Sequence, residues 1–232
     1  MIQRVLVMRS MVLSAACVVA LTLTIPALAQ TPSAPSTPSG PSAASSGVMT
    51  EGVLIEAMLK GSAESRDAAA NYVMAHPEAI NPLYLSALSL SLWKRGDRAQ
   101  AAFWFYVFQV RSRAWINADK SAAPLRASLN QQVGAMINPW IGSDLNAWYD
   151  IAGRALAYEK KIPLYPNPPA QLTPQQWQVV IAKARQENDA QFQEVFGGFR
   201  KDPQAFAAKR RENKLPVGPL QDPGAALPAT WR

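Results

Sequence analysis

The chain has 232 residues, a formal net charge of +7 at pH 7, one cysteine and one histidine. A single cysteine excludes a disulfide framework within the chain, and the shortage of histidine and cysteine excludes the usual zinc sites. Of the positive charge, +4 lies between Arg200 and Lys214, so the rest of the chain is close to neutral. The composition therefore does not predict a nucleic-acid-binding surface.

The first 29 residues have the features of a secretory signal. Arg4 and Arg9 precede a nearly continuous apolar run over residues 11–25, and Ala27-Leu28-Ala29 is a small-residue cleavage site. We therefore expect an exported protein, in the bacterial periplasm, whose mature chain carries +5 and no cysteine. An uncleaved membrane anchor is the alternative, because the apolar run is close to spanning length.

Composition divides the mature chain into three parts. Residues 30–47 are rich in proline and serine and carry no charge, which predicts a disordered linker. Residues 48–214 form the predicted domain, and residues 215–232 are predicted to be a Pro/Gly-rich tail. The domain begins with two short helices, one capped by Thr50 and ended by Gly61, the next running through Met74.

A helical hairpin follows and is expected to organise the domain. Asn81-Pro82 is a helix start, and Gly96-Asp97 ends one helix and caps the next. The second helix, through Trp115, carries Ala101 to Phe108, which is apolar or aromatic on every side. A helix of this kind must be covered all round, so we expect it to be the central helix of the domain.

This hairpin resembles the tetratricopeptide repeat. The positions that carry the resemblance are Leu85, Leu88, Leu92, Gly96-Asp97, Ala101 and Phe105. Ser89 and Phe108 depart from the family pattern, and the preceding hairpin matches it only weakly. The resemblance implies stacked hairpins with a concave groove that binds a protein or peptide, lined here by Tyr84, Ser91 and Arg111. An ordinary αα-hairpin with a glycine turn is the alternative.

The remaining chain is also predicted to be helical. Helices are expected over residues 124–136, 144–159 and 173–196, followed by a short one that starts at Asp202-Pro203. Predicted interruptions are a bend at residues 138–142, a proline-rich extended segment at 162–170, and a stop at Gly197-Gly198. The fold class is thus all-α: a bundle or short solenoid of about seven or eight helices built from antiparallel hairpins, with no sheet.

Catalytic chemistry has little support in the sequence. His76 precedes a proline at a helix end, which is typical of a surface turn, and neither a metal-binding loop nor a phosphate loop is present, so no metal or cofactor is expected. Glycan hydrolysis needs only a pair of carboxylates, so a hydrolase acting on envelope glycan is an alternative. The candidates are Glu51, Glu56, Asp144, Asp150 and Glu159.

Binding is therefore the preferred hypothesis: an exported, non-enzymatic helical domain that binds a protein or peptide in the cell envelope. Trp93 and Trp115, expected to be partly exposed at helix ends, are candidate partner-binding residues. Arg111 and Arg113, placed in the last turn of the central helix, are further candidates. A third hypothesis is contact with an anionic membrane or wall polymer through the basic C-terminal segment, at Lys209, Arg210 and Arg211.

Overall fold

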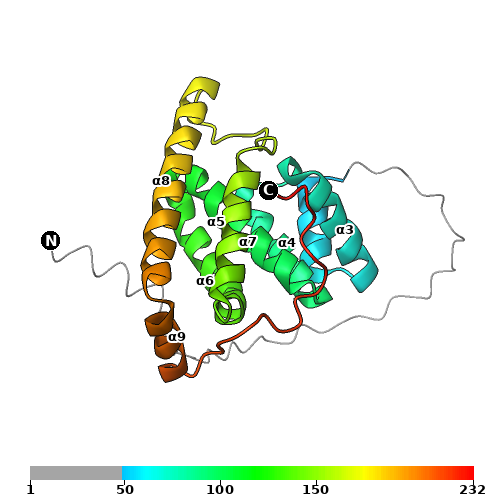
Figure 1. The fold of residues 1–232 in the computed structure, drawn as a ribbon. Coiled ribbons are helices and arrows are strands. Elements are labelled where there is room, and N and C mark those ends of the chain that lie inside the picture. The colour runs from blue at the N-terminus through cyan, green and yellow to red at the C-terminus, as the bar shows by residue number, and fades with distance from the viewer. Residues whose placement is uncertain (1–48) are drawn as a thin grey trace, which may run out of the picture. The chain divides into compact units, whose positions relative to one another are not determined.

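The computed structural model describes residues 49–232, and every regular element in this part of the chain is helical (Figure 1). The predicted signal and linker lie outside the described residues. The eight α-helices are α2 (Glu51–Lys60), α3 (Ala63–Ala75), α4 (Leu85–Arg95), α5 (Arg98–Ala118), α6 (Ala123–Ile141), α7 (Leu145–Glu159), α8 (Pro174–Lys201) and α9 (Pro203–Glu212). The all-α prediction is confirmed. Among these helices, none combines the length and apolarity needed to cross a membrane.

The α4–α5 hairpin forms where the sequence predicts it. Gly96 has a φ of 94°, in the left-handed region that favours glycine, and its N–H donates to the last carbonyls of α4. The two helices approach closely enough for the Ser89 hydroxyl to donate to the carbonyl of Ala101 at 2.7 Å. A small residue at position 89 therefore allows the helices to pack tightly.

Helix α5 is the centre of the fold. From Ala101 to Phe108 every residue is fully buried except Tyr106, which is half-buried. The helix packs against α4, α6, α7 and α8 (Figure 1). The predicted central helix is confirmed, and it continues to Ala118. Arg111 and Arg113 therefore lie inside the helix and not in its last turn.

Helices α6 and α8 run through two predicted interruptions. Pro139 lies inside α6, which ends at Ile141, so the chain turns later than predicted, at residues 142–144 and not from residue 138. Helix α8 continues through Gly197 and Gly198 to Lys201. The continuation brings the ring of Phe199 to 4.6 Å from that of Phe206 on α9, between ring centroids. This aromatic contact offsets the low helix propensity of the two glycines.

Residues 215–232 form an irregular segment, here called the strap, that packs against the helices. It has no helix, as its proline and glycine content predicts, but it is not a free tail. In Figure 1 it is the red segment that leaves α9 and crosses the face of the bundle. Trp231 is 7% exposed, and its ring stacks on that of Phe103 with centroids 4.7 Å apart. The strap is thus part of the core of the domain.

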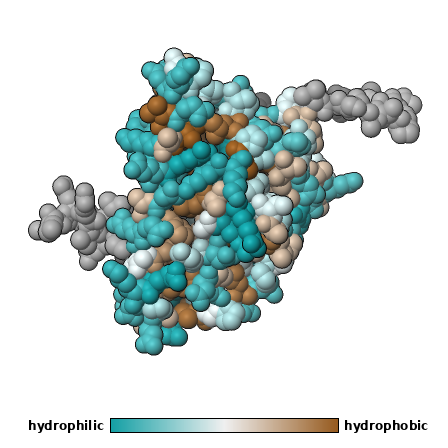
Figure 2. All heavy atoms as spheres, turned by 45° about the horizontal axis from the view of Figure 1, so that its top comes forward, coloured by the Kyte–Doolittle hydropathy of each residue, from teal (hydrophilic) through white to brown (hydrophobic). Residues whose placement is uncertain are grey.

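The surface carries apolar side chains in small groups. On the face drawn in Figure 2, hydrophobic residues are interspersed among hydrophilic ones. Exposed large hydrophobic side chains in the described residues include Met49, Val53, Leu59, Tyr72, Leu125, Val179 and Val217. Isolated exposures of this kind are normal for a globular domain and identify no site by themselves.

Candidate functional site

The predicted groove residues do not form a common open surface. Ser91 is 1% exposed and Arg111 is 4% exposed, so neither can contact a partner. Tyr84 is half-buried and packs against the main core. The Ser91 hydroxyl has no hydrogen-bond partner among the described residues. The groove implied by the tetratricopeptide resemblance is therefore closed at these positions.

The other predicted binding residues also face neighbours in the fold. Trp93 lies edge-on to Trp140, with ring centroids 5.8 Å apart. Trp115 lies edge-on to Trp177 at 6.2 Å. Arg113 donates to the side-chain oxygen of Gln191 on α8. All three predicted residues are half-buried, and their contacts hold helices together.

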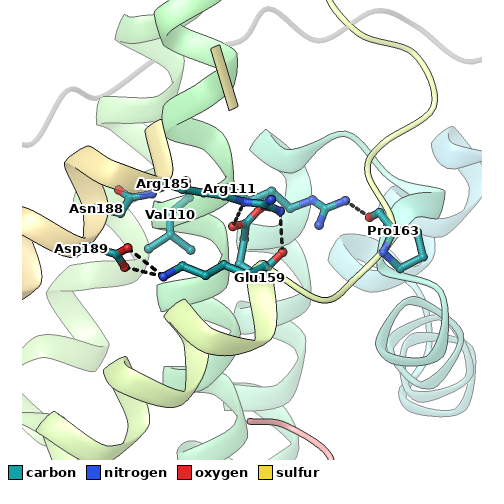
Figure 3. A network of polar contacts seen from close by, with 8 residues as sticks. Val110, Arg111, Glu159, Pro163, Arg185, Asn188 and Asp189 are labelled. Atoms are coloured by element: carbon teal, nitrogen blue, oxygen red, sulfur yellow. Dashed lines mark hydrogen bonds and ion pairs between the residues drawn. The ribbon is translucent and has the colours of Figure 1, made fainter. Parts of the chain in front are cut away.

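Arg111 belongs to a buried polar network that joins α5, α7 and α8 (Figure 3). Its guanidinium donates to the carbonyl of Pro163, in the segment between α7 and α8. Burial lowers the pKa of Arg111, and the negative charge of Glu159 partly opposes that shift. Glu159 is 5% exposed and accepts two hydrogen bonds from Arg185, at 2.9 and 3.2 Å. The Glu159 carboxylate thus pairs with Arg185 and acts on Arg111 through its charge.

Two further contacts link this network to α8. Asn188 is buried and donates to the carbonyl of Val110 at 3.0 Å, while Lys160 pairs with Asp189 at 2.8 Å. The space between these side chains is too narrow to admit a water molecule. The network therefore joins helices and offers no room for a ligand.

The candidate catalytic carboxylates mostly have structural partners. Glu51 accepts hydrogen bonds from the backbone of Asn81 and the hydroxyl of Tyr165. Asp144 caps α7 by accepting from the N–H groups of its first turn. These bonds are those of a helix cap and a tether between segments, not of a paired acid and base.

The remaining carboxylates give the same picture. Asp150 pairs with Arg154 one turn along α7 at 2.9 Å, and Glu159 is held by Arg185, as described above. Glu56 is exposed on α2. His76 is exposed and lies 3.6 Å from a carboxylate oxygen of Glu78. Within residues 49–232, no group of three or more histidine and carboxylate side chains could hold a metal ion.

An open pocket lies at the other end of α7, where α9 and the strap meet. Its volume is about 300 Å³. The start of α7 contributes Leu145, and α9 contributes Phe206 and Ala207. The strap contributes Val217 and Pro219. Apolar atoms dominate the lining, and the pocket opens to solvent.

Arg210 is one of the residues that line this pocket, but its guanidinium is held by the fold. It is 8% exposed, and its guanidinium donates to the carbonyls of Pro216 at 2.9 Å and Pro139 at 2.6 Å. Burial lowers its pKa. The prediction that Arg210 contacts an anionic surface is therefore wrong, because its donors already join α9, the strap and α6.

The other basic residues of this region remain on the surface. Lys209 is exposed and pairs with Glu212 at 2.8 Å, one turn along α9. Arg211 and Lys214 are also exposed, as is Lys201 at the end of α8. These four cations of the predicted basic segment are thus on the surface, while Arg210 is buried and joins helices to the strap.

An aromatic cluster adjoins the pocket through Phe206, and sequence reasoning missed it. Phe199 and Trp148 both have ring centroids within 6.2 Å of the Phe206 centroid. Phe192, Phe196 and Phe199 recur along α8 with helical spacing, a signal that was available in the sequence. The cluster fixes α8 and α9 against the start of α7, and so fixes the position of the pocket.

Comparison with known proteins gave no match: no family model, no curated protein and no solved structure is similar to this chain.

Proposed function

We propose that this is an exported, non-enzymatic protein that binds a protein or peptide in the cell envelope, and that it binds at the pocket between α7, α9 and the strap. One observation carries the proposal: an open, largely apolar pocket of about 300 Å³, one wall of which is α9, a helix that also carries exposed cations. That volume is at the lower end of the range for ligand sites and suits one bulky side chain. Export is inferred from the signal-like first 29 residues.

The chemistry of the pocket indicates the kind of partner. Leu145, Phe206 and Val217 offer apolar contacts to an aliphatic or aromatic side chain. Arg211 and Lys214 are exposed cations on the same α9 region. Carboxylates that flank the inserted side chain would be attracted to them, which favours acidic segments and speeds their association. We therefore expect an acidic peptide segment with one large apolar residue.

The proposal keeps the binding function implied by the tetratricopeptide resemblance but moves its location. The groove predicted from that resemblance depends on Ser91 and Arg111, which are buried. The alternative of a glycan hydrolase has less support, since four of its five candidate carboxylates are engaged in caps, ion pairs or tethers.

A pocket-filling substitution tests the proposal. Ala207 lines the pocket, whereas Ala208, the next residue of α9, is exposed and does not. Ala207→Trp should fill the pocket, and Ala208→Trp is the matched control. The probe is a fluorescein-labelled decapeptide of glutamate and aspartate with one central leucine, measured by fluorescence anisotropy.

We expect the unmodified protein to bind this peptide with a dissociation constant of about 100 μM or tighter, near −5.5 kcal/mol. Ala207→Trp should weaken binding at least about tenfold, and Ala208→Trp less than about twofold. Changing the leucine of the peptide to alanine should also cost about tenfold, because it removes about 1.5 kcal/mol of apolar burial. Equal binding by both variants, or none by the unmodified protein, would refute the proposal.

The same pair of variants identifies a natural partner. Each is immobilised and exposed to an envelope extract. The partner is a protein retained by the unmodified domain and by Ala208→Trp but absent from the Ala207→Trp sample.

A further inference from the structure

We infer that the strap is a detachable wall of this pocket and that Trp231, far from the pocket along the strap, is a positioning residue that controls binding. The inference rests on the proposed function, because it concerns the regulation of the same site.

One side of the pocket exists only while the strap is docked. Val217, Gly218 and Pro219 form this wall, while α7 and α9 supply the others. Gly218 holds the wall in place, since its N–H donates to the carbonyl of Ser143 at 2.9 Å. Without the strap, the pocket would be an open angle between two helices.

Most hydrogen bonds of the strap join it to other elements of the fold. Its hydrogen bonds with the helices include three in which strap carbonyls accept. The Trp140 indole N–H donates to the carbonyl of Gln221 at 2.7 Å, the Ala99 N–H to that of Pro223 at 2.8 Å, and the Gln100 amide to that of Ala226 at 3.1 Å. A segment without helix or strand has little structure of its own to retain once these contacts open.

Trp231 is the main apolar anchor of the strap. It is 7% exposed, stacks on Phe103, and lies edge-on to Trp104 with ring centroids 5.4 Å apart. Leu220 and Leu227 are only partly buried against the core, and Val217 is 38% exposed. Most of the apolar burial that favours docking is therefore concentrated at one indole, far along the strap from the pocket.

A second position, Gly224, lets the strap pack closely against the α4–α5 turn because glycine has no side chain. Gly224 has a φ of 72°, and a Cβ there would lie 2.3 Å from the carbonyl oxygen of Gly96 and 2.6 Å from the Cα of Asp97. Both atoms belong to the backbone of the α4–α5 turn, so they cannot move aside. Gly224→Ala should therefore detach the strap without truncating any core side chain.

Docking and binding are linked because a ligand contacts the strap wall only in the docked state. Ligand binding then stabilises the docked strap, and any change that undocks the strap weakens binding in the same proportion. If undocking leaves a tenth of the molecules with an intact pocket, the apparent dissociation constant rises about tenfold.

The experiment measures strap docking and peptide binding separately in the full chain. Docking is followed by hydrogen–deuterium exchange of the segment that contains the Gly218 amide, and binding by anisotropy with the acidic leucine decapeptide. The test variants are Trp231→Ala and Gly224→Ala. Trp231→Phe should preserve the stacking, and Arg232→Ala changes an exposed neighbour of Trp231. Far-UV circular dichroism checks that the helices remain.

We expect Trp231→Ala and Gly224→Ala to lose protection at the Gly218 segment and to bind the peptide at least tenfold more weakly. Trp231→Phe and Arg232→Ala should remain within threefold of the unmodified protein. Faster exchange with unchanged affinity would overturn the inference while leaving the proposed function intact. Unchanged exchange in both test variants would also overturn it. Failure of the unmodified protein to bind the peptide would instead refute the proposed function, and the inference with it. If Trp231→Ala loses helix, Gly224→Ala decides the outcome.

Discussion

Replacing Glu159 with glutamine is expected to lower the free energy of unfolding by about 3 to 5 kcal/mol. The carboxylate is 5% exposed, pairs with Arg185 at 2.9 Å, and its charge favours the protonated form of the buried Arg111. Glutamine keeps an oxygen that accepts one hydrogen bond from Arg185, but it removes the countercharge. Arg185, whose side chain is 29% exposed, then loses its ion-pair partner, and the buried Arg111 loses the largest of the charges that favour its protonated form.

Urea unfolding followed by circular dichroism measures this loss. With a denaturant slope of about 2 kcal/mol per molar, the expected change moves the midpoint down by roughly 1.5 to 2.5 M. Asp189→Asn is the matched control, since Asp189 belongs to the neighbouring ion pair with Lys160, where both side chains are more than 40% exposed. Exposed pairs contribute little, so the control should lose less than about 1 kcal/mol.

A loss below about 1 kcal/mol for Glu159→Gln, or one equal to that of Asp189→Asn, would refute the reasoning. It would mean that Glu159 is solvated in solution and that the two guanidinium groups do not depend on it.

Three further substitutions test the fold by the same urea assay. Phe103→Ala should cost about 3 to 5 kcal/mol, because it opens a cavity in the centre of the core; a cost under about 1 kcal/mol would contradict the packing described for α5. Asp144→Ala should cost about 1 kcal/mol through loss of the α7 cap, and no loss would show that the cap is not formed. Tyr106 is half-buried, but its hydroxyl is enclosed beside Trp148, and burial raises its pKa above the ordinary value of 10.0. Because the folded state favours the neutral phenol, stability should be lost as the pH rises above about 10, and less steeply in Tyr106→Phe; equal pH profiles would argue against an enclosed hydroxyl.

The central helix could be predicted from the sequence because its signal is local. A run that is apolar on all sides, such as Ala101 to Phe108, has only one stable environment, which is the interior of a bundle. The turn at Gly96 could also be predicted, since the left-handed backbone conformation at the end of a helix favours glycine. The helical fold class follows from these patterns without any tertiary contact.

The candidate site could not be predicted from the sequence, because the environment of its residues depends on contacts between distant segments. From the sequence, Arg111 is expected to be a surface cation near a helix end. In the structure the helix continues past it, and the charge of Glu159 on α7 acts on it. From the sequence, Arg210 is expected to belong to a basic patch, yet it is buried and donates to two backbone carbonyls. The strap has the composition of a tail, and its only signal was Trp231, a large aromatic residue with no evident place in a disordered segment.

The stacking of Trp231 on Phe103 has a consequence for biosynthesis. As the nascent chain leaves the ribosome, Phe103 and Trp104 emerge long before Trp231 is translated. Until then the apolar face that Trp231 covers is open to water and to other chains, which is the condition under which folding intermediates aggregate. Completion of the core must therefore wait until Trp231 has been translated, long after Phe103.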